Sequence, residues 1–179
     1  TFRGKKKTRF SVVRYGNVFG SRGSVALNFL EKLKSNTFDV TDENMTRFSI
    51  TLNDAVQFVM ECLQKMSGGE IFVPKIPSYR LPDLVKAFSK NAIIKIIGIR
   101  PGEKIHEEMI SSSDSQNTLE IKNFFIILPS IDQKILSVYK NKFGAKKVKK
   151  GFIYSSNLND KFLSIKELNQ LVEKFQKNL

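Results

Sequence analysis

The stretch FSVVRYGNVFGSRGS, residues 10–24, joins a short apolar run to a glycine-rich loop and to the start of another apolar segment. Residues 10–13 have the composition of a strand, and the Tyr-Gly-Asn sequence at 15–17 is typical of a turn. Ser24 is suited to cap a helix, because apolar residues recur at helical spacing from there to Leu33. The stretch therefore predicts a strand, a polar loop and a helix in succession.

The rest of the chain continues this alternation of extended and helical segments. Extended segments are predicted at residues 38–42, 47–51, 70–73, 93–99 and 124–128. Helices are predicted from residue 53 or 54 to the Gly68-Gly69 pair, and at residues 81–88, 104–110 and 164–175. Alternating strands and helices indicate an α/β architecture.

The apolar run at residues 10–13 also bears on how much of the fold is present. It is uninterrupted, as is typical of a strand inside a parallel sheet. Parallel neighbours are joined by crossovers of about a dozen residues or more, and there is no room for several of these upstream. We therefore expect the chain to be the later part of a larger fold.

Composition places the chain among ordinary globular proteins. It has 179 residues, of which 41% are hydrophobic and 26% are charged. No apolar run approaches the ~18 residues of a membrane span, and no signal peptide opens the sequence. The single cysteine, Cys62, can form no internal disulfide and has no second metal ligand at suitable spacing. We predict that Cys62 packs in the core of a protein of the reducing cytoplasm, without a metal site.

The net charge of +13 comes mainly from two stretches without acids. Of the 30 bases, 11 lie in residues 1–9 and 140–150, which leaves 19 bases against 17 acids elsewhere. Aromatic residues are not interleaved with these lysines as in a platform that stacks bases. We interpret the two stretches as solvated loops with no role in nucleic-acid binding. The alternative is a non-catalytic module that binds anionic partners through the lysines.

Three predicted loops carry polar residues that suit a phosphate ligand. They lie at residues 17–24, 46–47 and 100–103, each after an extended segment, and each contains one arginine. In open α/β sheets, ligands bind beyond the carboxyl ends of the strands, so such loops can converge. The planar guanidinium of arginine donates paired hydrogen bonds to phosphate oxygens and stays charged. The pattern predicts a diphosphate site.

Each loop taken singly has a simpler interpretation. GNVFGSRG lacks the Gly-Lys-Ser/Thr of a Walker loop and the G-x-G start of a dinucleotide fingerprint, so it can be a plain strand-to-helix turn. Arg47 can be a surface ion-pair partner. Glu103 can simply neutralise Arg100.

Taken together and in order, six segments resemble one family, the inverting UDP-N-acetylglucosamine 4,6-dehydratases. The segments are RYGNVFGSRGS, MTRFSIT, GGEIFVPKIPS, IIGIRPGEKIHEEMI, FFIILP and YSSN. The family consists of bacterial short-chain dehydrogenase/reductase enzymes of the extended type that begin pseudaminic acid synthesis. The resemblance runs from about residue 9 to 165 and corresponds to the C-terminal half of such an enzyme. Related UDP-N-acetylglucosamine 4-epimerases and membrane-anchored dehydratases of polysaccharide synthesis stay open as alternatives.

The resemblance implies a lyase that uses NADP. The cofactor oxidises the C4 hydroxyl of the sugar, water is lost across C5 and C6, and the hydride returns to C6 with inversion at C5. The cofactor supplies the redox chemistry, and the protein supplies position and proton transfer. In the family, the catalytic tyrosine, lysine and aspartate precede the strand that is FSVV here. We therefore expect no catalytic residue in this chain and no activity of the chain alone.

The resemblance also assigns residues of the first loop. Tyr15 and Gly16 correspond to the strand end that passes the nicotinamide, mainly through backbone atoms. Asn17 corresponds to an asparagine that hydrogen-bonds the sugar diphosphate. Arg22 corresponds to a residue on the substrate side of the cleft. Most of the NADP site is expected in the missing N-terminal half.

The second and third loops are assigned to the nucleotide. Thr46 and Arg47 correspond to the segment at the phosphates and the ribose. Arg100 corresponds to the diphosphate-binding arginine, and Glu103 to the acceptor for the uridine ribose hydroxyls, because a carboxylate accepts two hydroxyl donors well. His106, on the predicted helix, is expected to orient or pack rather than to catalyse.

The implied fold is the C-terminal part of an extended short-chain dehydrogenase/reductase with a Rossmann-like sheet. Residues 9–20 and 53–75 are the remaining sheet elements, and residues 21–52 and 76–179 form the substrate-binding subdomain and tail. The implied partners are UDP-N-acetylglucosamine and further copies of the chain, since relatives form homo-oligomers, commonly hexamers. No membrane contact is expected within this part of the enzyme.

Overall fold

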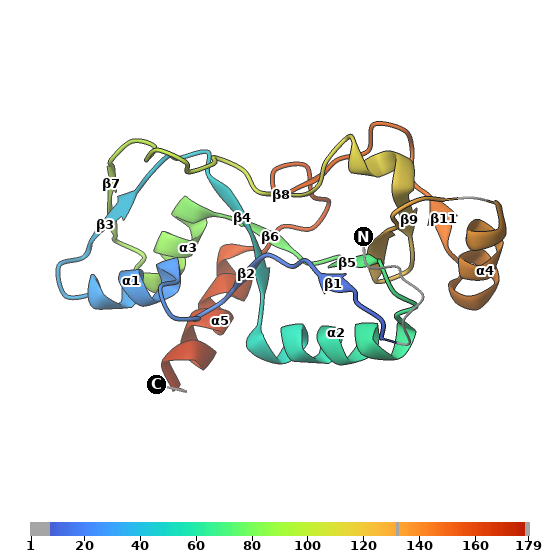
Figure 1. Ribbon diagram of the computed structural model, residues 1–179. Coiled ribbons are helices and arrows are strands. Elements are labelled where there is room, and N and C mark those ends of the chain that lie inside the picture. Colours follow the sequence, from blue (N-terminus) through green and yellow to red (C-terminus); the bar gives the residue numbers. More distant parts are fainter. Residues whose placement is uncertain (1–7, 132, 178–179) are drawn as a thin grey trace. The chain divides into compact units, whose positions relative to one another are not determined.

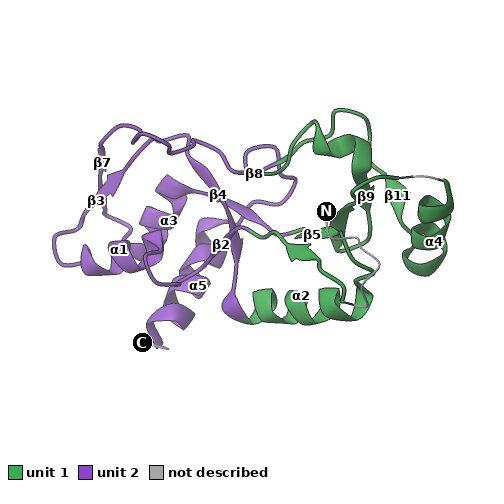
Figure 2. Cartoon of the chain, in the orientation of Figure 1, with its two compact units in different colours: residues 1–15, 53–75, 108–154 green, residues 16–52, 76–107, 155–179 purple. Residues whose placement is uncertain are grey.

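The computed structural model describes residues 8–131 and 133–177 (Figure 1). The chain forms two compact units, and it passes between them several times (Figure 2). The first unit contains Thr1–Tyr15, Asn53–Lys75 and Glu108–Tyr154. The second contains Gly16–Leu52, Ile76–Glu107 and Ser155–Leu179.

The first unit is built on a five-stranded sheet in the order β1-β5-β10-β9-β11. Its strands are β1 (Val12–Val13), β5 (Ile71–Pro74), β9 (Thr118–Glu120), β10 (Phe124–Ile127) and β11 (Lys146–Lys147). β1 runs parallel to β5, as predicted for FSVV, whereas the remaining neighbours pair antiparallel. The sheet is therefore mixed.

Two helices and a 3-10 turn complete this unit: α2 (Leu52–Lys65), η1 (Asp114–Asn117) and α4 (Gln133–Phe143). One side of α2 is buried through Ala55, Phe58 and Cys62. Burial raises the pKa of the Cys62 thiol to about 12, so the thiol is unreactive and packs in the core as predicted. A second apolar side of α2 is exposed, through Leu52, Val56, Val59, Met60 and Leu63.

A buried carboxylate ties this unit together. Glu70 is only 1% exposed, directly before β5. It accepts hydrogen bonds from the backbone N–H groups of Ser67 (2.8 Å) and Gly68 (2.7 Å), in the turn after α2. The hydroxyls of Ser11 (2.6 Å) and Tyr139 (2.7 Å, in α4) donate to the same carboxylate. Four donors thus replace the water that this charge loses on burial.

The second unit contains two small sheets. The first has the order β2-β4-β6, formed by β2 (Asn17–Val18), β4 (Thr46–Ile50) and β6 (Ser78–Arg80). β2 is parallel to β4, and β6 is antiparallel to it. The second pairs β3 (Thr37–Val40) in parallel with β7 (Ile93–Ile96). The strands β8 (Glu108–Ile110) and β12 (Tyr154–Ser155) lie where the chain passes from one unit to the other.

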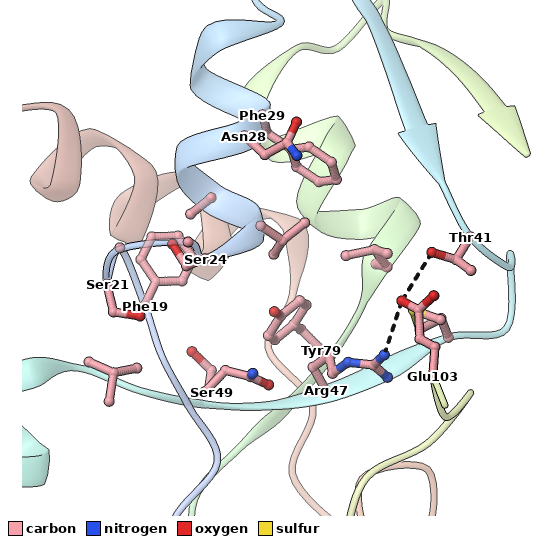
Figure 3. A pocket seen from close by; sticks show the side chains of 18 of the residues that line it. Phe19, Ser21, Ser24, Asn28, Phe29, Thr41, Arg47, Ser49, Tyr79 and Glu103 are labelled. Atoms are coloured by element: carbon pink, nitrogen blue, oxygen red, sulfur yellow. Dashed lines mark hydrogen bonds and ion pairs between the residues drawn. The ribbon is translucent and has the colours of Figure 1, made fainter. Parts of the chain in front are cut away.

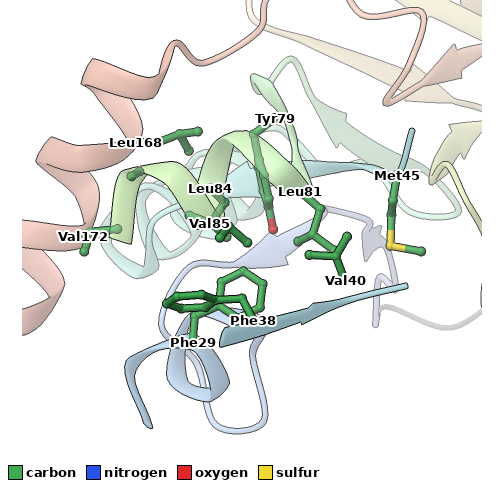
Figure 4. Packing of buried hydrophobic residues seen from close by; sticks show 11 residues of the cluster. Phe29, Phe38, Val40, Met45, Tyr79, Leu81, Leu84, Val85, Leu168 and Val172 are labelled. Atoms are coloured by element: carbon green, nitrogen blue, oxygen red, sulfur yellow. The ribbon is translucent and has the colours of Figure 1, made fainter. Parts of the chain in front are cut away.

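Three helices pack around these sheets: α1 (Val25–Glu31), α3 (Leu81–Phe88) and α5 (Ile165–Lys177). Pro82 lies in the first turn of α3, as predicted, where its missing N–H costs no hydrogen bond. The core gathers Leu84 of α3, Leu168 of α5 and the rings of Phe29 and Phe38 (Figure 4). The two rings meet edge to face, with centroids 5.4 Å apart. Each such side chain contributes roughly 1.5–3 kcal/mol by burial.

The helix predicted at residues 104–110 is wrong. Residues 104–107 form an irregular loop, and residues 108–110 are β8. The backbone of this segment bonds to distant residues instead of to itself. Ile105 O accepts from Thr46 N (3.0 Å), and Glu107 O accepts from Ser156 N (2.8 Å). These contacts take the carbonyls that a helix needs, so His106 does not lie on a helix.

The predicted grouping of the segments differs from the compact units at two places. Residues 16–20 were grouped with residues 53–75, but they belong to the second unit. Residues 108–154 were grouped with the substrate-binding part, but they belong to the same unit as Asn53–Lys75. The reason is that β10 pairs along β5, a contact between strands far apart in the sequence. The roles assigned to the two groups stay predictions. α4 was not predicted at all.

The structure describes all of the basic stretch at residues 140–150, but only residues 8 and 9 of the basic stretch at residues 1–9. Arg3, Lys5, Lys6 and Lys7 lie outside the described residues. The lysines of residues 140–150 lie on α4, on β11 and in the loop that follows, and all six are exposed. No helix within the described ranges is long and apolar enough to cross a membrane.

Candidate functional site

A cavity of about 450 Å³ lies within the second unit. Its walls come from β2 and the loop after it, from α1, β3, β4 and β6, and from residues 97–103 (Figure 3). Cavities of roughly 300–1,000 Å³ typically bind small molecules. The cavity brings together five of the residues that the sequence assigned to a substrate: Asn17, Arg22, Arg47, Arg100 and Glu103.

The structure explains why two positions of the first loop, Gly16 and Gly20, are glycine. A Cβ on Gly16 would lie 2.4 Å from Cβ of Phe48, because β2 runs close beside β4 at this point. Gly20 has a φ of +76°, and a Cβ there would lie 2.5 Å from the ring of Phe175. Glycine is thus required by close backbone approach and by left-handed conformation. The interpretation as a strand-to-helix turn is therefore correct for the backbone, and the side chains of the same loop line the cavity.

Ser24 occupies the position before α1, as predicted, with an extended backbone. Its hydroxyl makes no capping hydrogen bond, however, and its Oγ is buried without a partner among the described residues. Ser24 also lines the cavity. The hydroxyl therefore does not cap the helix, although the residue itself is part of the cavity wall.

Arg47 is held in place by its surroundings. Its side chain is 14% exposed, and Nη1 donates to the carbonyls of Thr46 (2.8 Å) and Ile105 (3.0 Å). Nη2 lies 3.8 Å from Oε1 of Glu103, and Nε lies 3.5 Å from Oε1 of Glu107. Arg47 is therefore not a loose surface ion-pair partner. It is a fixed, largely buried cation in the cavity wall.

Glu103 lies between two elements of the cavity. Its Oε1 accepts a hydrogen bond from Thr41 Oγ1 (3.2 Å) as well as facing Arg47 (Figure 3). Its Oε2 accepts from the backbone N–H of Arg100 (3.3 Å). The ion-pair partner of Glu103 is thus Arg47, and Arg100 contacts Glu103 through its main chain. Both Arg100 and Arg22 have exposed side chains.

Thr46 is the one predicted substrate residue that does not line the cavity. It is buried, and its Oγ1 lies 2.8 Å from Nδ1 of His106 and 2.7 Å from Oγ of Ser156. This network joins β4 to the loop before β8 and to the chain after β12. His106 is thus hydrogen-bonded to a buried threonine, a contact that suits the orienting or packing role expected for His106.

Tyr15 and Gly16, expected to contact a cofactor, do not line the cavity either. Tyr15 is exposed, and Gly16 packs against Phe48. Their cofactor role stays a prediction. No group of three or more His, Cys, Asp or Glu side chains is placed to hold a metal ion in the described ranges.

Glu107 is a functional candidate that the sequence analysis missed. With the amide nitrogen of Asn17 turned toward it, that nitrogen donates to Oε1 (2.8 Å) and Oε2 (3.1 Å) of Glu107. Phe48 N also lies 3.4 Å from Oε2. Burial raises the pKa of Glu107, while the charge of Arg47 and the two hydrogen bonds oppose that shift. The sequence analysis missed Glu107 because it placed residues 104–110 on a helix. The one sequence signal for Glu107 was that it follows Glu103 by four residues.

Asp39 and Tyr79 also line the cavity without having been predicted. Lys32 hydrogen-bonds Asp39 and lowers the pKa of that carboxyl. Burial raises the pKa of Tyr79, and the nearby Glu107 adds to this shift. The cavity therefore combines cations, engaged carboxylates and hydroxyls, which suits a polar ligand that carries negative charge and several hydroxyls.

Comparison with known proteins identifies the family and the fold. Residues 1–129 match the family described as "Polysaccharide biosynthesis protein". The chain is 51% identical over 176 residues to UDP-N-acetylglucosamine 4,6-dehydratase (inverting) of Campylobacter jejuni, a match that covers 94% of this chain and 52% of that protein. It is 35% identical over 175 residues to UDP-glucose 4-epimerase of Rickettsia bellii, covering 94% of this chain and 50% of that protein.

A solved structure confirms the predicted α/β fold. The structure of Pen from Bacillus thuringiensis superposes with a TM-score of 0.81 at 37% identity, and the match covers 99% of this chain and 53% of that one. The chain thus spans about half the length of the relatives it matches. The resemblance found in the sequence is confirmed, and the chain belongs to the polysaccharide biosynthesis protein family.

Proposed function

We propose that this chain carries the nucleotide-sugar-binding part of an inverting UDP-N-acetylglucosamine 4,6-dehydratase. One observation supports this above others: five side chains from β2 and the loop after it, from β4 and from residues 100–103 line one cavity in a single unit. The identity of 51% to the Campylobacter jejuni enzyme points to the same substrate class. We propose that this part binds and orients the nucleotide sugar, and we assign no catalytic residue to it.

The arginines of the cavity have distinct proposed roles. Arg22 and Arg100 have exposed side chains, so they can turn toward a diphosphate without breaking an internal ion pair of the kind that holds Arg47. Arg47 keeps Glu103 in position, and Glu103 accepts hydrogen bonds from the ribose hydroxyls in place of Thr41. The two exposed cations, Arg22 and Arg100, would together balance the charge of the diphosphate.

A nicotinamide cofactor would supply the hydride chemistry of such an enzyme, and NADP is the form that we propose. The residues of this chain fit it only in part, because Phe48 occupies the space beside Gly16. We therefore limit the cofactor contact of this chain to backbone atoms at Tyr15 and Gly16. The rest of the cofactor site, and assembly into a homo-oligomer, belong to the whole enzyme.

Titration of the purified chain with UDP-N-acetylglucosamine, followed by calorimetry, tests this proposal. Arg100→Ala should weaken binding by about 1.5–3 kcal/mol, the scale of a hydrogen bond to a charged group. Arg9→Ala is the matched control, because Arg9 is also exposed but belongs to the other unit. Equal affinity of Arg100→Ala and the parent chain would remove Arg100 from the site.

A second candidate is a 4-epimerase, since a UDP-glucose 4-epimerase is also among the relatives. Both reactions need the same kind of nucleotide-sugar cavity, so binding alone does not separate them. Product analysis of the whole enzyme does: a 4-keto-6-deoxy sugar supports the dehydratase, and an unoxidised C4 epimer supports the alternative.

A further inference from the structure

The loop after β2 contacts the last turns of α5 through one aromatic ring. A Cβ on Gly20 would lie 2.5 Å from both Cδ2 and Cε2 of Phe175, so the ring lies directly against the backbone of that glycine. The same ring meets the ring of Phe19 edge to face, with centroids 5.9 Å apart. Phe19 and Gly20 line the cavity, as do Ser21 and Arg22 that follow them. Phe175 therefore supports the cavity wall from behind.

The helix that carries Phe175 is itself fixed in the core of the second unit. Leu168 and Val172 precede Phe175 on the same side of α5, because spacings of three and four residues bring side chains to one helix face. Both are buried in the core of this unit (Figure 4). Nδ2 of Asn169 also donates to the carbonyl of Ala87 in α3 (3.1 Å). The ring of Phe175 is thus a fixed surface for the loop.

The loop has little internal support of its own. The backbone N–H of Ser21 donates to the carbonyl of Val18 (3.2 Å), and that of Ser24 donates to the carbonyl of Ser21 (3.0 Å). Both bonds close short turns, and the two residues between Ser21 and Ser24 are exposed. Glycine at position 20 adds conformational freedom, because it lacks a Cβ. A contact from outside the loop is therefore needed to hold it in one conformation.

We propose that Phe175 is a positioning residue of the nucleotide-sugar site. Its ring fixes Phe19 and Gly20, and thereby sets where Arg22 meets the ligand. A loop that is ordered before binding loses less conformational entropy when the ligand arrives, so the affinity rises. The inference rests on the proposed function, in which Arg22 binds the diphosphate. The resemblance found in the sequence ends at about residue 165, so it assigned no role to α5.

Amide hydrogen exchange, followed by NMR, tests the contact without any ligand. In Phe175→Ala, the amides of Ser21 and Ser24 should exchange about tenfold faster or more, because the loop opens locally. The amide of Thr46, which donates to the carbonyl of Ile105 (3.0 Å) in the same unit, should change much less. Equal acceleration at Thr46 would show a general loss of stability and would overturn the proposal, as would unchanged exchange at Ser21 and Ser24.

The matched control is Phe162→Ala. Phe162 is also a partly exposed ring of the second unit, but it lies against the guanidinium of Arg80 (5.5 Å). Its loss should leave exchange at Ser21 and Ser24 as in the parent chain. If Phe175→Ala does not fold, the same measurements are made on Phe175→Leu, which removes the flat ring and changes the core less.

Double variants test whether Phe175 acts through Arg22. Phe175→Ala and Arg22→Ala should each weaken binding of UDP-N-acetylglucosamine about tenfold or more, the scale of one hydrogen bond to a charged group. The variant with both changes should bind within about threefold of the weaker single variant, because both changes remove the same contact. The losses of Phe175→Ala and Arg100→Ala should multiply, because a different loop carries Arg100.

A merely structural role of Phe175 predicts something else, namely losses that multiply with Arg22→Ala as they do with Arg100→Ala. That result would overturn the positioning role. If the parent chain does not bind UDP-N-acetylglucosamine at all, the proposed function falls, and the role toward Arg22 falls with it. The hydrogen-exchange result decides in either case whether Phe175 orders the loop.

Discussion

The pKa values of two carboxyl groups, Glu70 and Glu107, are shifted in opposite directions by their surroundings. Burial alone would raise the pKa of Glu70, but donors from Ser11, Tyr139 and the backbone outweigh it and lower the pKa. At Glu107 burial prevails over the donors and over Arg47, and the pKa is raised. The fold therefore stabilises the charge of Glu70 and strains that of Glu107.

Glu70→Gln should lower the free energy of unfolding at neutral pH by about 2–3 kcal/mol, because an amide nitrogen would face donors in place of an oxygen. The pKa of Glu70 is lower in the folded than in the unfolded chain, so its stabilisation is present above the unfolded pKa. It is lost as the pH falls through the folded pKa. Urea unfolding at neutral and at acidic pH measures both effects.

The control for Glu70→Gln is Glu120→Gln, because Glu120 makes an exposed ion pair with Lys75. Such pairs contribute little, so the change should stay below about 1 kcal/mol. A difference between Glu70→Gln and the parent chain that does not shrink in acid would contradict the assigned pKa shift.

Glu107→Gln should behave in the opposite way. A folded pKa above the unfolded one means that the protonated form fits the fold better, and that stability is lost as the pH rises through the folded pKa. Removing the charge should therefore leave the free energy of unfolding at neutral pH unchanged or higher. Urea unfolding beside Glu70→Gln tests this; an equal loss in the two variants would show that the Arg47 contact dominates.

At the scale of elements, β2 and the loop after it bring the cavity residues to one place. β2 can lie close beside β4 only because Gly16 has no Cβ. The exposed loop that follows then carries Arg22 to the same cavity as Arg47. Sequence reasoning identified this loop but did not show that its first glycine is a packing requirement.

Gly16→Ala should separate β2 from β4 and destabilise the chain by about 1–3 kcal/mol, the usual cost of overpacking. Binding of UDP-N-acetylglucosamine should fall as well, because Asn17 is the next residue. Gly23→Ala is a matched control in the same loop: nothing lies within 4 Å of its Cβ position, and only its φ of +74° is unfavourable. Thermal unfolding that ranks Gly23→Ala as the more damaging change would refute the packing argument.

The segment at residues 104–110 shows where local patterns mislead. Its apolar residues, Ile105, Met109 and Ile110, have helical spacing, and acidic residues lie between them. In the fold, the backbone groups of this segment bond to Thr46 and Ser156. Periodicity reports which side chains share a face, and it carries no information on whether the main chain has a partner elsewhere.

At the scale of the whole molecule, we expect the 179-residue chain to bind a nucleotide sugar but not to convert it. Among the residues that line the cavity, Glu103 faces Arg47 and Asp39 is hydrogen-bonded to Lys32, and burial raises the pKa of Tyr79. Both carboxylates are engaged by bases, so we expect neither to take a proton from the substrate. Mass spectrometry after incubation with UDP-N-acetylglucosamine and NADP should find the substrate unchanged, with the homologous Campylobacter jejuni enzyme as positive control. A dehydrated product would contradict this.

The sequence by itself determined the alternation of strands and helices, the burial of Cys62 and five residues that share one cavity. These follow from local composition and from the resemblance of ordered segments. Tertiary structure alone decided that Thr46 points into the interior, that residues 108–154 join the sheet of β5, and that Glu107 lies against Asn17. Each of these depends on backbone groups and side chains that are distant in sequence, and their pairing is set only when the whole chain packs.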